Sequence, residues 1–143
     1  MQYILDIYKE LFFSLKRGNT KGVFSNAKPI FLLSIFDSIN FNTTNEIRWG
    51  NKELIYKYSQ LNQQYNILKP TLLWKPFYYL SSEPFYTLVW KETPPEELLK
   101  RPSGKLLKDY LDYAKLDDEL WTLLQDADNR EYLRNCIINQ YLS

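Results

Sequence analysis

The first half of the chain carries two apolar patterns with helical spacing. Residues 3–15 place apolar side chains at i, i+3 and i+4 with charged residues opposite, which predicts an amphipathic helix that ends before Gly18. Residues 18–28 are rich in Gly, Asn and Lys and predict a loop. Pro29 suits the first turn of a helix, and the residues that follow it are apolar on almost every side. We therefore predict a central, buried helix over residues 29–39.

The middle of the chain predicts a further helix and a hairpin. Residues 46–49 have the composition of a short strand, and Asn51 is a good N-cap for a helix with apolar residues at a/d-like spacing. Residues 72–80 and 85–90 are dense in aromatic and β-branched types, with Ser-Ser-Glu-Pro between them. This pattern predicts a β-hairpin, and Pro76 places its first arm at an edge or a bulge.

Helices dominate the last third of the chain. We predict one over residues 106–114 capped near Ser103, a second that begins at Asp117 and a third capped by Asp126. Together these patterns predict an α+β fold over residues 1–143: a mainly helical single domain with a small antiparallel β-sheet, the hairpin, packed on the helices.

The composition excludes several classes of enzyme. The chain has no His and one Cys, so a Ser-His-Asp or Cys-His catalytic site cannot form, and Cys136 alone cannot build a zinc site. The four glycines lack the spacing of a phosphate-binding loop. We expect a protein that is not an enzyme and holds no cofactor and no metal. A metal nuclease that uses only carboxylates, such as Asp117 or Asp118, is the catalytic alternative.

The chain has no apolar run near the length of about 20 residues that spans a bilayer. Its first residues carry Asp6, Lys9 and Glu10 within the apolar pattern, unlike a signal peptide. The single Cys fits a reducing compartment. These features predict a soluble, cytoplasmic protein without a membrane partner.

Positive charge is unevenly distributed although the net charge is only +1. No acid lies between Glu10 and Asp37, and the cations of this interval are Lys16, Arg17, Lys21 and Lys28. Such a face suits contact with phosphates, and an ordinary solvated loop has the same composition. Lys28 lies beside the N-terminus of the predicted central helix, so its ammonium and the free N–H groups of the helix could bind a phosphate together. Alternatively, Lys28 has no role in binding and its side chain points into water.

Aromatic residues make up 17% of the chain, more than a small core usually holds. Lys75 is followed by Pro76 and three aromatic rings, so this arm could hold an uncharged group by contact while the ammonium meets a phosphate. Strand alternation instead favours burial of Phe77 and Tyr79 in the core, with Pro76 and Tyr78 facing outward.

The order of four segments resembles the sulfur-binding domain that accompanies HNH modules in type IV restriction endonucleases. The segments are AKPIFLLSIFDSI, NEIRW with the helix after it, WKPFYYLSSEPFYTLVW and LDDELWTLLQDADNREYLRNCIINQYL, and the resemblance spans about residues 8–142. It implies non-catalytic recognition of double-stranded DNA in which sulfur replaces a non-bridging phosphate oxygen, in restriction and defence. The sequence has no His for an HNH site, so we expect an excised domain of a larger nuclease, a stand-alone reader, or a subunit whose partner is a nuclease module or subunit.

The resemblance also implies the residues of the site. Lys28 and Pro29 match the helix-start motif of the family, and Pro76-Phe77 match its Pro-Phe strand, but Ala27 and Lys75 stand where members often have His and Tyr. The expected phosphate contacts are Arg17, Lys21, Lys28 and Lys75. The expected sulfur pocket consists of Pro29, Trp74, Pro76, Phe77 and Tyr78. The competing hypothesis is a protein–protein interaction domain that uses an exposed aromatic hairpin.

Overall fold

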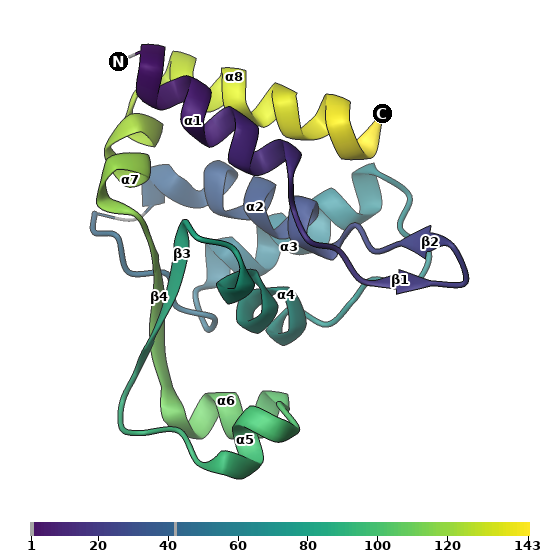
Figure 1. Cartoon of the computed structure of the whole chain (residues 1–143), viewed down its shortest axis with the longest axis vertical. Helices are drawn as coiled ribbons and strands as arrows, with labels where there is room; N and C mark the ends of the chain where they lie inside the picture. The colour runs from purple at the N-terminus through teal and green to yellow at the C-terminus, as the bar shows by residue number, and fades with distance from the viewer. Residues whose placement is uncertain (1, 42) are drawn as a thin grey trace.

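A single buried helix lies at the centre of the computed structural model, which describes residues 2–41 and 43–143. This helix is α2 (Ala27–Ser38), in which every residue from position 28 to position 36 is buried. α1 (Gln2–Phe13) and α8 (Ala127–Ile137) lie side by side above it, and α3 (Lys52–Gln64) packs along it (Figure 1). The predicted central helix is confirmed, and it begins two residues earlier than predicted.

Shorter helices complete the helical part of the fold. They are α4 (Trp74–Tyr79), α5 (Glu96–Lys100), α6 (Gly104–Tyr110), α7 (Asp118–Gln125), the 3-10 turns η1 (Ile39–Phe41) and η2 (Leu80–Ser82), and the π-helical turn η3 (Ile138–Leu142). Three predicted N-caps are confirmed, since the side chains of Asn51, Ser103 and Asp126 accept hydrogen bonds from the first turns of α3, α6 and α8.

In the part of the chain that the structure describes, two small antiparallel sheets accompany the helices. β1 (Asn19–Thr20) and β2 (Val23–Phe24) form a hairpin that projects from the body of the molecule (Figure 1). β3 (Tyr86–Trp90) pairs with β4 (Leu111–Leu116), and this ribbon leads to α5 and α6 at the far end of the molecule. The structure thus confirms a mainly helical α+β fold with a small antiparallel sheet.

The predicted hairpin of residues 72–80 and 85–90 is wrong in its first arm. Residues 74–79 form α4, and only the second arm is a strand. Pro76 lies in the first turn of α4, where a missing N–H costs no intrahelical hydrogen bond, so a proline that is typical of an edge strand is equally compatible with a helix start. A dense aromatic run does not by itself distinguish a short buried helix from a strand.

The predicted helix over residues 106–114 ends early, at Tyr110. Residues 111–116 form β4, in which Leu111, Ala114 and Leu116 are buried. Pairing with β3 outweighs the local helical signal here, because the ladder satisfies backbone groups of both segments. The predicted strand over residues 46–49 is reduced to a single bridge between Ile47 and Ala114.

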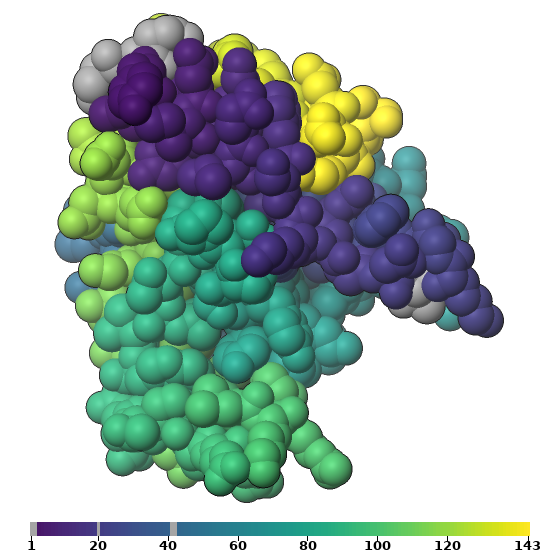
Figure 2. All heavy atoms as spheres, in the orientation of Figure 1, coloured from purple at the N-terminus to yellow at the C-terminus, as the bar shows by residue number. Residues whose placement is uncertain are grey.

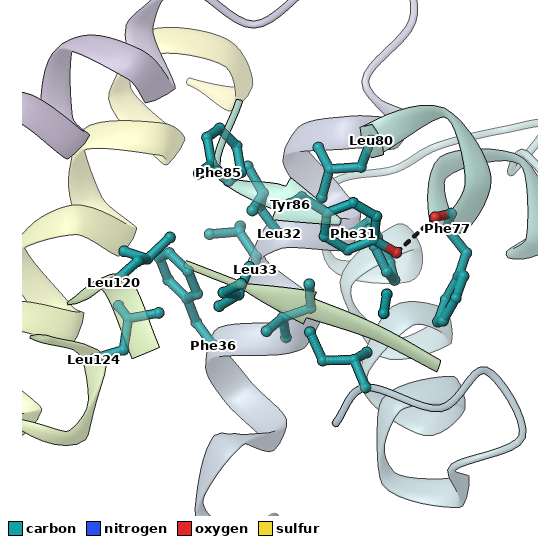
Figure 3. Close-up of a cluster of buried hydrophobic side chains, with 14 of the residues drawn as sticks. Phe31, Leu32, Leu33, Phe36, Phe77, Leu80, Phe85, Tyr86, Leu120 and Leu124 are labelled. Atoms are coloured by element: carbon teal, nitrogen blue, oxygen red, sulfur yellow. Dashed lines mark hydrogen bonds between the residues drawn. The ribbon is translucent and has the colours of Figure 1, made fainter. Parts of the chain in front are cut away.

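The core continues from α2 into α4, β3 and α7. Phe31 of α2 lies 5.6 Å from the ring of Phe77 and 6.1 Å from that of Tyr86, measured between ring centroids. Figure 3 shows this cluster extending past Phe36 toward Leu120. These ring contacts fix α4 against α2. The opposite face of α4 is exposed to solvent, and its position relative to α2 is therefore fixed as well.

Candidate nucleic-acid interface

A pocket of about 430 Å³ lies where the base of the β1–β2 hairpin, the start of α2 and the outer face of α4 meet. The charged residues that line it are all cations, and the wall between them is largely apolar. Its lining residues are Lys16, Arg17, Gly18, Ser25, Ala27, Lys28, Thr71, Lys75, Pro76, Tyr79 and Ser82. In Figure 2 the surface steps inward between the projecting hairpin and the lobe of α5 and α6.

Four predicted site residues from three separate segments of the chain meet at this pocket. Arg17, Lys28, Lys75 and Pro76 all line it. The chain between α1 and β1 supplies Arg17, the first turn of α2 supplies Lys28, and α4 supplies the other two. The pocket thus brings three of the expected phosphate contacts beside one residue of the expected sulfur pocket.

Lys28 is buried in an ion pair, which neither hypothesis for this residue anticipated. Its ammonium lies 2.8 Å from Oε2 of Glu83 and donates a second hydrogen bond of 2.8 Å to Oγ of Ser82. The Lys28 side chain is 10% exposed and the Glu83 side chain 3%. Lys28 therefore does not point into water. It forms the buried part of the pocket lining, the pocket floor, and Glu83, which lies outside the lining, compensates its charge.

Arg17 lies between two aromatic rings at the mouth of the pocket. The central carbon of its guanidinium is 4.9 Å from the ring centroid of Phe24 and 4.7 Å from that of Tyr141. One guanidinium nitrogen also donates a hydrogen bond of 3.1 Å to Oδ1 of Asn26. Because planar stacking on two rings restrains a guanidinium, Arg17 is held as a fixed cation and also links the hairpin to the C-terminal turn.

The helical geometry of α4 decides which of its side chains reach the pocket. Residues three and four positions apart share a helix face, so Tyr79 lies on the same side as Lys75 and Pro76 and lines the pocket with them. The prediction that Tyr79 belongs to the core is wrong, since it is 47% exposed. The outward orientation predicted for Pro76 is only partly right, because it is buried yet contributes to the pocket wall.

Five predicted site residues lie away from the pocket. Lys21 is exposed at the tip of the hairpin with a φ of 52°, and Pro29 is buried within α2. Phe77 is fully buried in the core, and the ring of Trp74 lies against Gly104 at the start of α6. The ring of Tyr78 packs edge-on to that of Tyr79 at 5.1 Å, and partial burial raises the pKa of its hydroxyl.

Three further residues shape the site, and of these sequence analysis named only Lys16, as a cation of the interval without acids. Lys16 and Ser82 line the pocket, and Glu83 holds Lys28 beneath it. Ser82 and Glu83 were assigned to the connection of a hairpin, so no role followed for them. The available signal was the interval without acids between Glu10 and Asp37, since a buried cation in such an interval needs a partner from elsewhere in the chain.

A second concave region has the opposite charge. Asp117, Asp118 and Glu119 line a pocket of about 380 Å³ together with Tyr8 and Lys115. The Tyr8 hydroxyl donates a hydrogen bond of 3.0 Å to Asp117, and partial burial beside this carboxylate raises the pKa of Tyr8. Within the described residues, no group of three or more His, Cys, Asp or Glu side chains is arranged to hold a metal ion.

No protein-family model matches this chain, and no curated protein matches it significantly. The resemblance to the sulfur-binding domains therefore rests on the order and spacing of the four segments quoted above. Among the helices in the described part of the chain, none has the length and apolarity required to cross a membrane.

Proposed function

We propose that this chain is a non-catalytic module that binds double-stranded DNA and recognises a phosphorothioate in its backbone. The observation that carries the proposal is the convergence of Arg17, Lys28, Lys75 and Pro76 on one pocket. Four residues chosen from the sequence for this purpose come from three separate segments and line the same concavity. In this proposal the chain acts in restriction and defence in the cytoplasm, and a nuclease module or subunit cuts the DNA.

The physical basis is the difference between sulfur and oxygen as surface groups. Sulfur is larger and more polarisable than oxygen and is less strongly hydrated, so its transfer to an apolar wall costs less desolvation free energy. Pro76 and the ring of Tyr79 would supply that wall. Lys16, Arg17 and Lys75 at the rim would contact neighbouring phosphates, which position a duplex without reading its sequence.

A paired binding measurement tests this function. Two duplexes of the same sequence, one with a single phosphorothioate of defined stereochemistry and one with oxygen only, are compared by gel shift at matched salt. We expect tighter binding of one phosphorothioate diastereomer than of its oxygen twin. Equal affinity for the oxygen duplex and both diastereomers would overturn sulfur recognition while leaving general DNA binding in place.

A protein-interaction module is the second candidate, and it is favoured by exposed apolar side chains on the hairpin and in the segment before α4. Val23 on the hairpin is 71% exposed, and Leu68 and Leu72 before α4 are 94% and 67% exposed. This hypothesis no longer depends on an aromatic hairpin at residues 72–90, which does not form. It predicts a mass that rises with concentration in light scattering and no salt-sensitive retention of DNA.

A further inference from the structure

Glu83 is a buried carboxylate directly behind the cationic pocket. It is 4% exposed and follows the short turn η2. Oε2 accepts hydrogen bonds from the Lys28 ammonium at 2.8 Å and from the backbone N–H of Lys16 at 2.9 Å. The same carboxylate oxygen thus contacts one residue of the pocket floor and the backbone of one residue of its rim.

The ion pair with Glu83 limits the hydrogen bonds and the positive charge that Lys28 can contribute to a bound ligand. An ammonium has three N–H donors, and two of them are already directed to Glu83 and Ser82. The negative charge of Glu83 also compensates the positive charge of Lys28 at contact distance. The pocket floor is therefore a nearly neutral surface with one remaining donor, while the uncompensated charges lie at the rim, on Lys16 and Lys75 among others.

We propose that Glu83 is a specificity-determining residue, which acts through Lys28 to keep the pocket floor neutral and so to disfavour an ordinary phosphate there. This inference rests on the proposed function, because it concerns how the same pocket separates sulfur from oxygen. An uncompensated ammonium would form a strong charge-assisted hydrogen bond with a phosphate oxygen. Sulfur is a weak acceptor and would gain less. A neutral floor removes that advantage of oxygen.

The decisive variant is Glu83→Gln, which keeps the shape and an acceptor oxygen but removes the charge. We expect the variant to bind the oxygen duplex more tightly than the wild type does and to show a smaller ratio of sulfur to oxygen affinity. The plot of log K against log salt should become steeper by about 0.9, the effect of one additional neutralised phosphate. A purely structural role of Glu83 would not add a unit to this slope.

Two further variants make the test specific. Glu131→Gln removes one negative charge from an exposed position of α8, outside the pocket lining, and should leave the slope unchanged. The double variant Lys28→Gln/Glu83→Gln removes both charges of the pair. If the pair is neutral toward DNA, its slope should equal that of the wild type.

Each result supports or overturns the inference. A folded Glu83→Gln protein with an unchanged slope would overturn it, and so would an equal increase of the slope in Glu131→Gln. If circular dichroism shows that Glu83→Gln does not fold, the double variant decides: a slope shallower by about one unit would mean that the charge of Lys28 acts on DNA despite Glu83. Absence of salt-dependent DNA binding by the wild type would instead overturn the proposed function itself.

Discussion

The hydroxyl of Tyr86 donates a buried hydrogen bond of 2.6 Å to the backbone carbonyl of Phe77 (Figure 3). Tyr86 is the first residue of β3, and Phe77 lies in α4. Carbonyls of a last helical turn commonly lack intrahelical partners, and this hydroxyl supplies a donor to one carbonyl in the last turn of α4. The bond therefore couples the helix that forms one wall of the pocket to the central ribbon.

Replacement of Tyr86 by Phe should lower the free energy of unfolding by about 1–3 kcal/mol, because the Phe77 carbonyl would lose a buried donor. Urea denaturation of the variant and the wild type measures this difference. Tyr3→Phe is the matched control, since Tyr3 is 77% exposed and its hydroxyl is accessible to water. Equal stability of Tyr86→Phe and the wild type would show that the hydrogen bond contributes nothing net.

The sequence predicts the strand β3 correctly but predicts the wrong partner for it. The residues of β3 were correctly predicted to form a strand, but the partner was sought in residues 72–80 because they are adjacent and aromatic. The true partner is β4, whose pairing joins Tyr86 to Leu116 and Trp90 to Leu111. Non-local pairing depends on the packing of the whole chain, so local periodicity could not reveal it.

Alkaline pH should destabilise the fold partly through Tyr58. Burial raises the pKa of Tyr58 to about 12, and its hydroxyl donates a hydrogen bond of 2.5 Å to the carbonyl of Thr71. Since the unfolded side chain ionises near pH 10 and the folded one near pH 12, the folded state keeps a proton that the unfolded state has lost. The resulting stability is fully present below pH 10 and is lost as the pH rises to about 12.

The measurement compares unfolding free energies between pH 9 and pH 12 for the wild type and Tyr58→Phe. We expect a shallower decline for the variant, with a difference of about 2–3 kcal/mol accumulated across the interval. Parallel curves would contradict a buried, ionisable Tyr58. Other buried tyrosines, such as Tyr86, contribute to the decline in both proteins, so only the difference between the curves is diagnostic.

The candidate site could be predicted in its chemistry but not in its geometry. The interval without acids indicates Arg17 and Lys28, the Lys-Pro-aromatic run indicates Lys75, and these three cations line one pocket. The strand period wrongly favours burial of Tyr79, which lines the pocket as part of a helix. The resemblance places Phe77 in the sulfur pocket, but Phe77 is fully buried in the core. Glu83, which compensates the charge of Lys28, lies 55 positions away in the sequence. A single sequence does not show which residues pair over such a separation.

Arg17→Lys should loosen the β1–β2 hairpin while it preserves the charge. A lysine cannot stack on Phe24 and Tyr141 together, and loss of cation–π contacts worth about 0.5–1 kcal/mol would allow the hairpin to open more often. Hydrogen exchange at the amide of Ser25, which donates to the Gly18 carbonyl at 2.7 Å, should accelerate by about two- to fivefold. The amide of Ala114 in β4 is the internal reference, and equal acceleration of both amides would indicate global destabilisation instead.

Lys75→Ala should weaken DNA binding through charge alone. Lys75 is exposed on α4 at the rim of the pocket, and its ammonium lies 5.8 Å from the ring centroid of Trp74, so its removal should change the unfolding free energy by less than about 0.5 kcal/mol. The slope of log K against log salt should become shallower by about 0.9, because one phosphate contact is lost. Lys115→Ala, at the acidic pocket, removes the same charge from another surface. If both variants flatten the slope equally, the DNA is attracted by overall charge, and the pocket is not the binding site.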